Sequence, residues 1–227
     1  NRTRNTTLTF TGTAESGSTV EILVGGVSKA SGTATGGNYS IAVDLSAGAG
    51  FGEGTWSITA RATDVAANVS TQSAALSVTI DTTAPTVTSF TPSDAEIAET
   101  DSGTVTLAFT YSEAMDTSID PTISFAPSVS ARIGAVQGYS WAGNTVTATY
   151  TAVTGGSDPA TDIVVTVQGA ADVAGNTQAV FNSDPADFAV SLAAAGPAAA
   201  APAPRAAARS EPAAPIRRST RSSASVA

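Results

Sequence analysis

The stretch from Asp64-Val-Ala-Ala-Asn68 to Asp81-Thr-Thr-Ala-Pro85 decides how the chain is organised. Between these segments, apolar and polar residues alternate over residues 76–80, a pattern typical of a half-buried β-strand. Pro85 cannot donate a backbone hydrogen bond, and its ring restricts the preceding residue to extended conformations. A related segment, Asp172-Val-Ala-Gly-Asn176, comes later and again precedes a strand-like run. We therefore interpret the opening stretch as the end of one module and the start of the next.

Short alternating runs continue on both sides of this boundary, at a spacing of roughly ten residues that is typical of a β-sandwich. They fall at residues 7–14, 20–24, 27–35, 39–45, 55–63 and 76–80, and then at residues 86–90, 105–111, 123–125, 146–150, 163–167 and 188–192. The sequence therefore predicts an all-β protein with two tandem antiparallel β-sandwiches, residues 1–83 and 84–192. Residues 193–227 are rich in Ala, Pro, Arg and Ser without alternation, so they are predicted to form a disordered tail.

The 227 residues contain no Cys and no His. Without Cys, the chain has no disulfide framework to stabilise it. Without His, both the commonest general base and the commonest transition-metal ligand are missing. Zinc, iron and copper sites are therefore disfavoured, whereas carboxylate and carbonyl oxygens suit Ca²⁺ or Mg²⁺.

The charge of the chain is unevenly distributed. Residues 1–192 hold 18 acidic and five basic side chains, whereas the remaining residues hold one acid and five arginines. A strongly acidic body disfavours nucleic-acid binding and favours cation binding. No run of residues reaches the apolar length of a membrane-spanning helix, and the start shows no signal-peptide pattern. We therefore predict no nucleic-acid partner and no transmembrane segment.

Several short motifs follow one another in order along the two modules. The first module carries Thr11-Gly-Thr-Ala-Glu-Ser-Gly-Ser-Thr-Val20, Gly54-Thr-Trp-Ser-Ile-Thr-Ala60 and the Asp81 segment, and the second carries Tyr111-Ser-Glu-Ala-Met-Asp116 and the Asp172 segment. In these features, residues 6–192 resemble the Ig-like repeats of large bacterial surface adhesins, including RTX-type ones. The resemblance implies Ig-like sandwiches, a cell-surface or secreted setting, a stalk or adhesive role, and often calcium at domain junctions.

The chain departs from that family's pattern in two places. The strand that precedes residues 7–14 in the family is missing here or reduced to residues 1–6, which predicts an exposed sheet edge. The first Asp loop has Ala67 where the family usually has Gly. If this position needs a positive φ, the backbone of Ala67 is strained.

The Ig-like topology implied by the resemblance brings several acidic loops to one pole of the second module, where the chain enters it. The side chains expected to converge there as hard oxygen ligands for Ca²⁺ are Asp81, Glu113, Asp116 and Asp172. The equivalent pole of the first module, at the opposite end of that module from Asp81, offers Glu15 and Asp64 as a weaker metal site. The alternative is that these Asp and Asn side chains only shape turns by capping local N–H groups. No dense Asp-x-Asp-x-Asp-Gly loop is present to decide between the two.

The residue inventory disfavours catalysis. Glu113 and Asp116 are paired carboxylates of the kind that glycosidases use, but a turn after a strand explains them more simply. A Ser nucleophile would need a Lys or carboxylate partner, and Lys29, the single Lys, has no accompanying motif. We predict that the chain is not an enzyme.

Three functions remain open for this chain. The first is a structural stalk that spaces an adhesive tip from a bacterial cell, with neighbouring Ig-like modules as partners and calcium as the stiffener. The second is a module that binds host or matrix glycan or protein, for which Tyr139 and Trp141 are the candidate contacts. Trp56 alternates in phase with core residues and is predicted to be buried instead. The third is an accessory domain of a secreted hydrolase. All three place the protein at the cell surface or outside the cell.

Overall fold

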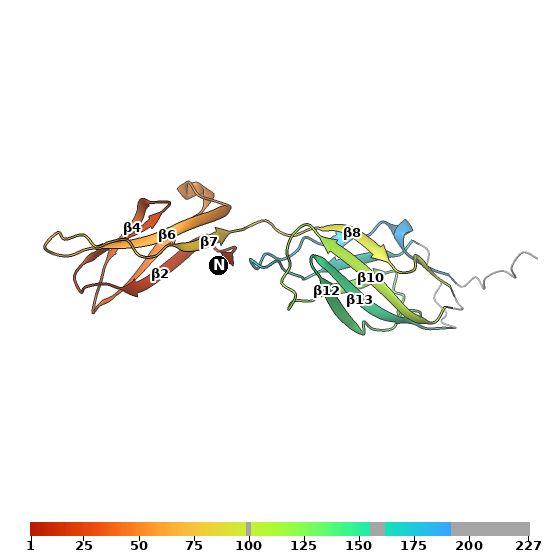
Figure 1. The fold of residues 1–227 in the computed structure, drawn as a ribbon. Helices are drawn as coiled ribbons and strands as arrows, with labels where there is room; N and C mark the ends of the chain where they lie inside the picture. The colour runs from red at the N-terminus through yellow and green to blue at the C-terminus, as the bar shows by residue number, and fades with distance from the viewer. Residues whose placement is uncertain (99–100, 155–161, 192–227) are drawn as a thin grey trace, which may run out of the picture. The chain divides into compact units, whose positions relative to one another are not determined.

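The computed structural model describes residues 1–98, 101–154 and 162–191. These residues form β-strands and turns, together with two short 3₁₀ helices, Ala47–Ala49 and Pro185–Asp187 (Figure 1). The predicted all-β class is therefore confirmed. The predicted disordered tail and the last residue of the strand expected at residues 188–192 lie outside the described residues.

The first sandwich consists of a five-stranded sheet in the order β1-β7-β6-β3-β4 and a two-stranded sheet that pairs β2 with β5. Its strands are β1 (Arg2–Thr3), β2 (Thr7–Thr13), β3 (Thr19–Val24), β4 (Val27–Thr33), β5 (Asn38–Asp44), β6 (Gly54–Thr63) and β7 (Leu76–Ile80). The pairings are antiparallel except for β1, which runs parallel to β7. The first strand of the described chain therefore joins the larger sheet and leaves the smaller one with two strands.

Alternate residues of the two sheets form the core of the first sandwich. Val20 and Ile22 from β3 belong to the same buried cluster as Ile41 and Val43 from β5. Because successive side chains of a strand point to opposite faces, the residues between them face solvent or the rim. Burial of this apolar surface holds the two sheets together.

The second sandwich consists of a four-stranded sheet in the order β12-β13-β10-β8 and a three-stranded sheet in the order β11-β14-β15. The strands are β8 (Val87–Pro92), β10 (Gly103–Tyr111), β11 (Thr122–Ala126), β12 (Gly138–Ala142), β13 (Thr145–Ala152), β14 (Val164–Gln168) and β15 (Phe181–Asn182). A further parallel pair joins β9 (Glu96–Ile97) to β16 (Ala189–Val190). The chain thus leaves the four-stranded sheet after β8, and β9 pairs with the last strand of the domain.

Aromatic and aliphatic side chains from both sheets form the second core. Phe109 on β10 is fully buried and stacks on Phe90 of β8, with 4.9 Å between ring centroids. The hydroxyl of Tyr111 donates to the buried Gln178 side-chain oxygen at 2.8 Å. A well-packed core of this kind gives a rigid frame for the loops at its pole.

The two sandwiches share part of their strand arrangement. The β2–β5 pair matches the β10–β13 pair. In the parallel pairs β1–β7 and β9–β16, the first strand immediately precedes the inner strand β2 or β10, and the second strand is the last of its domain. The Asp64 loop follows β6 and the Asp172 loop follows β14, so the two loops occupy equivalent places. The correspondence fails at two places among the described residues. The strand β4 pairs with β3 whereas β12 pairs with β13, and β8 lies beside β10 while no described strand lies on the same side of β2. The predicted open edge is therefore present in the described chain.

Candidate metal centre at the junction

The Asp172 loop is a tight turn built around one carboxylate. Asp172 Oδ1 accepts hydrogen bonds from the backbone N–H groups of Ala174 and Asn176, both at 2.8 Å. Its Oδ2 accepts from the side-chain amide of Asn176, also at 2.8 Å. Gly175 completes the turn with a φ of 92°, a conformation that glycine adopts without strain. The loop is therefore held by its own side chains, and its carboxylate has a fixed position.

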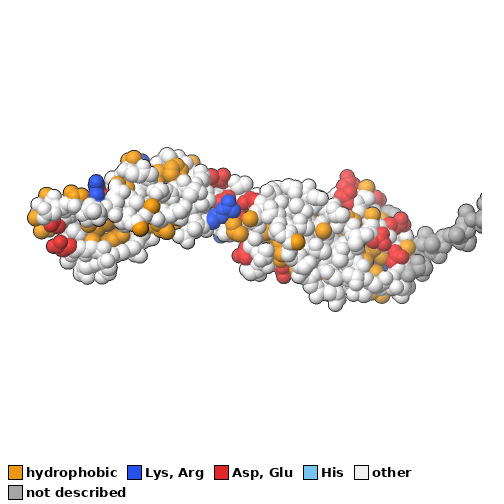
Figure 2. Space-filling view, in the orientation of Figure 1, with side chains coloured by type: hydrophobic (Ala, Val, Ile, Leu, Met, Phe, Trp, Pro, Cys, Tyr) orange, Lys and Arg blue, Asp and Glu red, His pale blue; other side chains and the backbone are white. Residues whose placement is uncertain are grey.

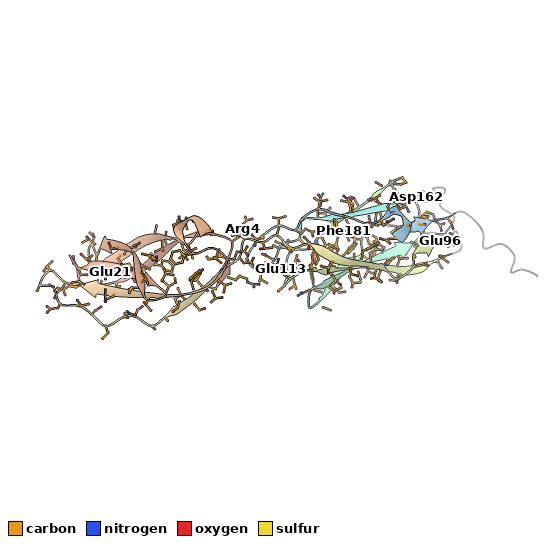
Figure 3. All side chains as sticks on the ribbon, turned by 90° about the horizontal axis from the view of Figure 1, so that it is seen from above. Arg4, Glu21, Glu96, Glu113, Asp162 and Phe181 are labelled. Atoms are coloured by element: carbon orange, nitrogen blue, oxygen red, sulfur yellow. The ribbon has the colours of Figure 1, made fainter. Side chains whose placement is uncertain are left out.

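Three carboxylates meet beside this loop. Oxygen atoms of Asp81, Glu113 and Asp172 all lie within 4.8 Å of one another. Asp172 is only 1% exposed, Asp81 is 9% exposed, and Glu113 is half-buried. Glu113 lies near the segment that joins the two sandwiches (Figure 3). Three of the four side chains expected to converge at this pole are therefore brought together.

The electrostatics of the group favour an added positive charge. Burial and the neighbouring carboxylates of Asp81 and Asp172 raise the pKa of Glu113, although Arg2 opposes this increase. The guanidinium of Arg2 lies 3.6 Å from Asp81, so one cation already offsets part of the charge. On the face shown in Figure 2, acidic side chains are distributed over both sandwiches and basic ones are sparse. A raised pKa at a crowded carboxylate means that its ionised form lacks sufficient compensation.

Asp116 does not join this group, which corrects the expectation that all four acids converge. Its carboxylate accepts from the backbone N–H and the hydroxyl of Ser118, at 3.0 and 2.6 Å. These bonds lower the pKa of Asp116 and commit the side chain to its own turn. The alternative of a turn-shaping Asp therefore describes Asp116, whereas it describes Asp172 only in part.

Sequence reasoning did not identify three further residues that make contacts at the junction. Glu53, in the loop before β6, accepts hydrogen bonds from Thr82 and Thr83 through the same carboxylate oxygen. Asn176 donates its side-chain amide to the backbone oxygen of Asp81 at 2.9 Å. The backbone N–H of Arg4 bonds to the Ala174 oxygen at 3.1 Å, so the entering chain also touches the Asp172 loop (Figure 3). These contacts depend on packing between segments that are distant in sequence, so no local motif predicts them.

The carboxylate group fits a Ca²⁺ ion better than a transition metal. Ca²⁺ binds oxygen ligands at about 2.3–2.6 Å, so two ligands of one ion can lie up to about 5 Å apart. The carboxylate separations meet that condition. The ion takes six to eight oxygens, so three carboxylates would supply part of its coordination and water or backbone oxygens the rest. The chain contains no His and no Cys, which are the commonest protein ligands of transition metals.

Comparisons with known proteins agree with this architecture. Two family models, each described as a bacterial Ig-like domain, match residues 1–82 and residues 81–194. The chain belongs to the bacterial Ig-like domain family. A search of curated proteins found no match. Bacterial Ig-like domains are typically non-catalytic structural or adhesive modules, and they are often part of extracellular or surface proteins. Among the described residues, no helix combines the length and the apolar character that crossing a membrane requires.

The outer pole of the first Ig-like domain carries the weaker predicted site. Glu15 and Asp64 line the same open hollow of about 410 Å³, together with Asn68. Asp64 Oδ1 accepts from the Asn68 backbone N–H at 2.7 Å and Oδ2 from its side-chain amide at 2.8 Å. These bonds lower the pKa of Asp64. This pole thus repeats the turn of the second domain, but Glu15 is exposed and Asp64 is only half-buried.

The aromatic side chains of the two Ig-like domains are engaged in packing. Trp141 stacks on Tyr111 with 6.0 Å between ring centroids, and its indole N–H donates to Asp120 at 3.0 Å. Tyr139, on the same face of β12, packs against the second core. Trp56, predicted to be buried, is half-buried and packs against the first core, and its N–H donates to the Gly52 oxygen at 3.1 Å. The two candidate glycan contacts are therefore partly buried and make internal contacts.

Proposed function

We propose that these two Ig-like domains form a non-catalytic spacer of a bacterial surface or secreted adhesin, stiffened at its junction by Ca²⁺. The observation that carries the proposal is the meeting of Asp81, Glu113 and Asp172 at the connecting segment. Asp81 lies directly after the last strand of the first domain, and the other two belong to loops of the second. An ion bound by all three would couple the segment between the domains to the second domain.

The protein contacts at the junction support a spacer because they come from both domains. Glu53 holds the segment from the first domain, and Asn176 holds it from the second. A spacer keeps its ends far apart only if the connection between its domains resists bending. Direct hydrogen bonds across a short connection limit this bending. Hydrogen bonds to the charged Glu53 carboxylate are stronger than those between neutral groups.

The role of the ion follows from the charge at the junction. Ca²⁺ would neutralise carboxylates whose mutual repulsion raises the pKa of Glu113. Ionised Glu113 is the form that binds a cation, so the affinity for Ca²⁺ is expected to increase as the pH rises through this raised pKa. The residues themselves position the ligands: the turn fixes Asp172, while β7 leads directly into Asp81.

The experiment is calcium titration of the complete chain, followed by calorimetry and by thermal unfolding in Ca²⁺ or in chelator. A single site saturated a hundredfold above its Kd stabilises the folded state by about 2.7 kcal/mol, which raises Tm by several degrees. The Glu113→Gln variant is expected to lose most of this increase. Asp116→Asn is the matched control, because it changes an acid of the same loop outside the carboxylate group, and it is expected to keep the increase.

Two results would contradict the proposal in different ways. An identical Tm in Ca²⁺ and in chelator would show that the chain does not bind Ca²⁺. The Tm could instead depend on calcium while X-ray scattering shows no narrowing of the interdomain distance distribution. That result would support a calcium site but contradict its stiffening role.

A further inference from the structure

The side chain of Arg2 is a positive charge that already lies at the carboxylate group of the junction. Its Nε lies 3.6 Å from Asp81 Oδ2, and the side chain is 40% exposed. The other carboxylate oxygen of Asp81 accepts the backbone N–H of Thr83 at 3.2 Å. Because a buried charge is costly without a partner, Arg2 offsets part of the cost of the buried Asp81 carboxylate. A cation is thus present at this group of acids before any metal binds.

The backbone holds Arg2 beside Asp81. β1 runs parallel to β7, with Arg2 opposite Thr79. The N–H of Asp81 donates to the Thr3 oxygen at 3.0 Å. The backbone of Arg2 therefore cannot leave the junction without breaking this strand pair, whereas its long side chain has many rotamers.

The contact between Arg2 and Asp81 is loose compared with the other arginine–carboxylate pair of the described chain. A distance of 3.6 Å exceeds the usual length of an N–H···O hydrogen bond. By contrast, Arg61 donates to Glu21 from two nitrogens, at 2.7 and 3.2 Å. The side chain of Arg61 is 37% exposed, so the two arginines are similarly accessible to water. Displacing Arg2 from Asp81 would therefore break an ion pair but no direct hydrogen bond between the two side chains.

An open hollow gives an ion access to the same carboxylates. Arg2, Asp81 and Glu113 all line this hollow of about 430 Å³. Ca²⁺ takes six to eight oxygen ligands and often keeps water among them, so it needs such room at a site with few carboxylates. Within the hollow, Arg2 and an entering ion would meet the same side chains.

We propose that Arg2 competes with Ca²⁺ at the junction: it offsets the charge of Asp81 when no ion is bound, and it turns into solvent when Ca²⁺ binds. This inference rests on the calcium site of the proposed function. Two cations beside one carboxylate repel each other, so the guanidinium and the ion exclude one another. The apparent affinity for Ca²⁺ is then reduced by the fraction of molecules in which Arg2 has left the site. Arg2 thus raises the calcium concentration at which the junction stiffens.

The first test is calcium binding by calorimetry to the complete chain with Arg2→Met. Met keeps an unbranched apolar stem and removes the charge, so we expect the Kd for Ca²⁺ to decrease roughly tenfold. Arg2→Lys keeps a positive charge and is expected to have a Kd close to the native value. Arg61→Met is the matched control, because it removes an ion-paired arginine of similar exposure away from the junction, and it is expected to leave the Kd unchanged.

Thermal unfolding separates competition from a purely structural role of Arg2. In chelator, Arg2→Met leaves Asp81 and Glu113 less compensated, so its Tm should be lower than the native Tm. In saturating Ca²⁺ the difference should vanish or change sign, because the ion supplies the charge without a competitor. A loss of packing alone would lower the Tm equally in both conditions and would contradict the proposal.

The outcomes distinguish this inference from the proposed function. If the native chain binds Ca²⁺ and folded Arg2→Met binds it with equal or weaker affinity, the inference is overturned while the calcium site stands. If only Arg2→Met binds Ca²⁺, the competition is supported, and the proposed function of the native chain is contradicted. If neither binds Ca²⁺, both are overturned. Circular dichroism reports whether each variant folds, and Arg2→Gln serves as a second neutral variant.

Discussion

The Asp64 and Asp172 loops share a motif and a turn but differ in their surroundings. In both, one carboxylate oxygen accepts the backbone N–H of the Asn four residues later, and the other accepts the Asn side-chain amide. The Asp64 loop is exposed, whereas Asp172 and Asn176 are buried, and Asn176 also bonds to Asp81. The motif thus specifies a turn, and the neighbouring domain turns one copy into part of a junction.

Replacing each Asp by Ala should distinguish the turn from the junction, and it is expected to give the largest change in stability of the variants considered. Asp172→Ala leaves the half-buried N–H of Ala174 and the two buried donors of Asn176 without their acceptor, so we expect the second domain to lose about 3 kcal/mol of unfolding free energy. Asp64→Ala frees donors that water can reach, and we expect a much smaller loss in the first domain. Equal losses would show that burial at the junction contributes nothing.

The chain provides a probe for each domain in this measurement. Trp56 lies in the first domain and Trp141 in the second, and there are no other tryptophans. Urea unfolding followed by fluorescence in Trp141→Phe or Trp56→Phe backgrounds therefore reports each domain separately. Both tryptophans pack against their cores, so their emission should change on unfolding.

Exchanging Ala and Gly at the matching position of the two loops is expected to have an intermediate effect on stability. Ala67 has a φ of 69° and Gly175, at the matching position, a φ of 92°. The left-handed conformation costs a residue with Cβ roughly 1–2 kcal/mol, and glycine loses more chain entropy on folding. We expect Ala67→Gly to stabilise the first domain by about 0.5 kcal/mol and Gly175→Ala to destabilise the second by about 1 kcal/mol.

The same fluorescence measurement checks the exchange. A Cβ at position 175 would have Arg4 Nε as its nearest neighbour at 3.9 Å, which is ordinary contact. Any destabilisation by Gly175→Ala therefore comes from the backbone rather than from a clash. No change in either variant would show that the loops relax without strain.

The strained loop illustrates what could be predicted from sequence. Alternation located the main strands because each sandwich buries one face of each strand. The resemblance placed the Asp loops and identified Ala67 as a position of strain. The short strands β1, β9 and β15 lack enough residues for a detectable period. Their positions are fixed by pairing with distant segments instead.

The junction was predicted incompletely for a similar reason. Topology brought Asp81, Glu113 and Asp172 to one pole, but it could not show that Asp116 would bind Ser118 in its own turn. Two acids of one loop have the same chemistry, and local hydrogen bonds decide which faces the junction. Glu53 was missed because its partners, Thr82 and Thr83, are separated from it in the sequence by the two strands β6 and β7.

The smallest expected effect, and the one that most sharpens the comparison, is the pH dependence of Glu113. Its pKa is raised in the folded protein, so the folded state binds more protons than the unfolded state between the two pKa values. Stability is therefore lost as the pH rises from the unfolded value of about 4.3 through the raised folded value. Without calcium, Glu113→Gln should be slightly more stable than the native chain at neutral pH. The two should converge below about pH 4, where Glu113 is protonated in both states.

Asp116→Asn provides a control of opposite sign. Hydrogen bonds from Ser118 lower the pKa of Asp116, so its carboxylate stabilises the fold above the unfolded pKa and loses that effect as the pH falls through the folded one. Asp116→Asn should therefore be less stable than the native chain at neutral pH. Urea unfolding from pH 3 to 8 in chelator measures both differences. Calcium should reverse only the first, because a bound cation would make ionised Glu113 stabilising, whereas Asp116 would remain in its turn. If the difference for Glu113→Gln kept its sign in calcium, the carboxylate group would be a repulsive junction without an ion.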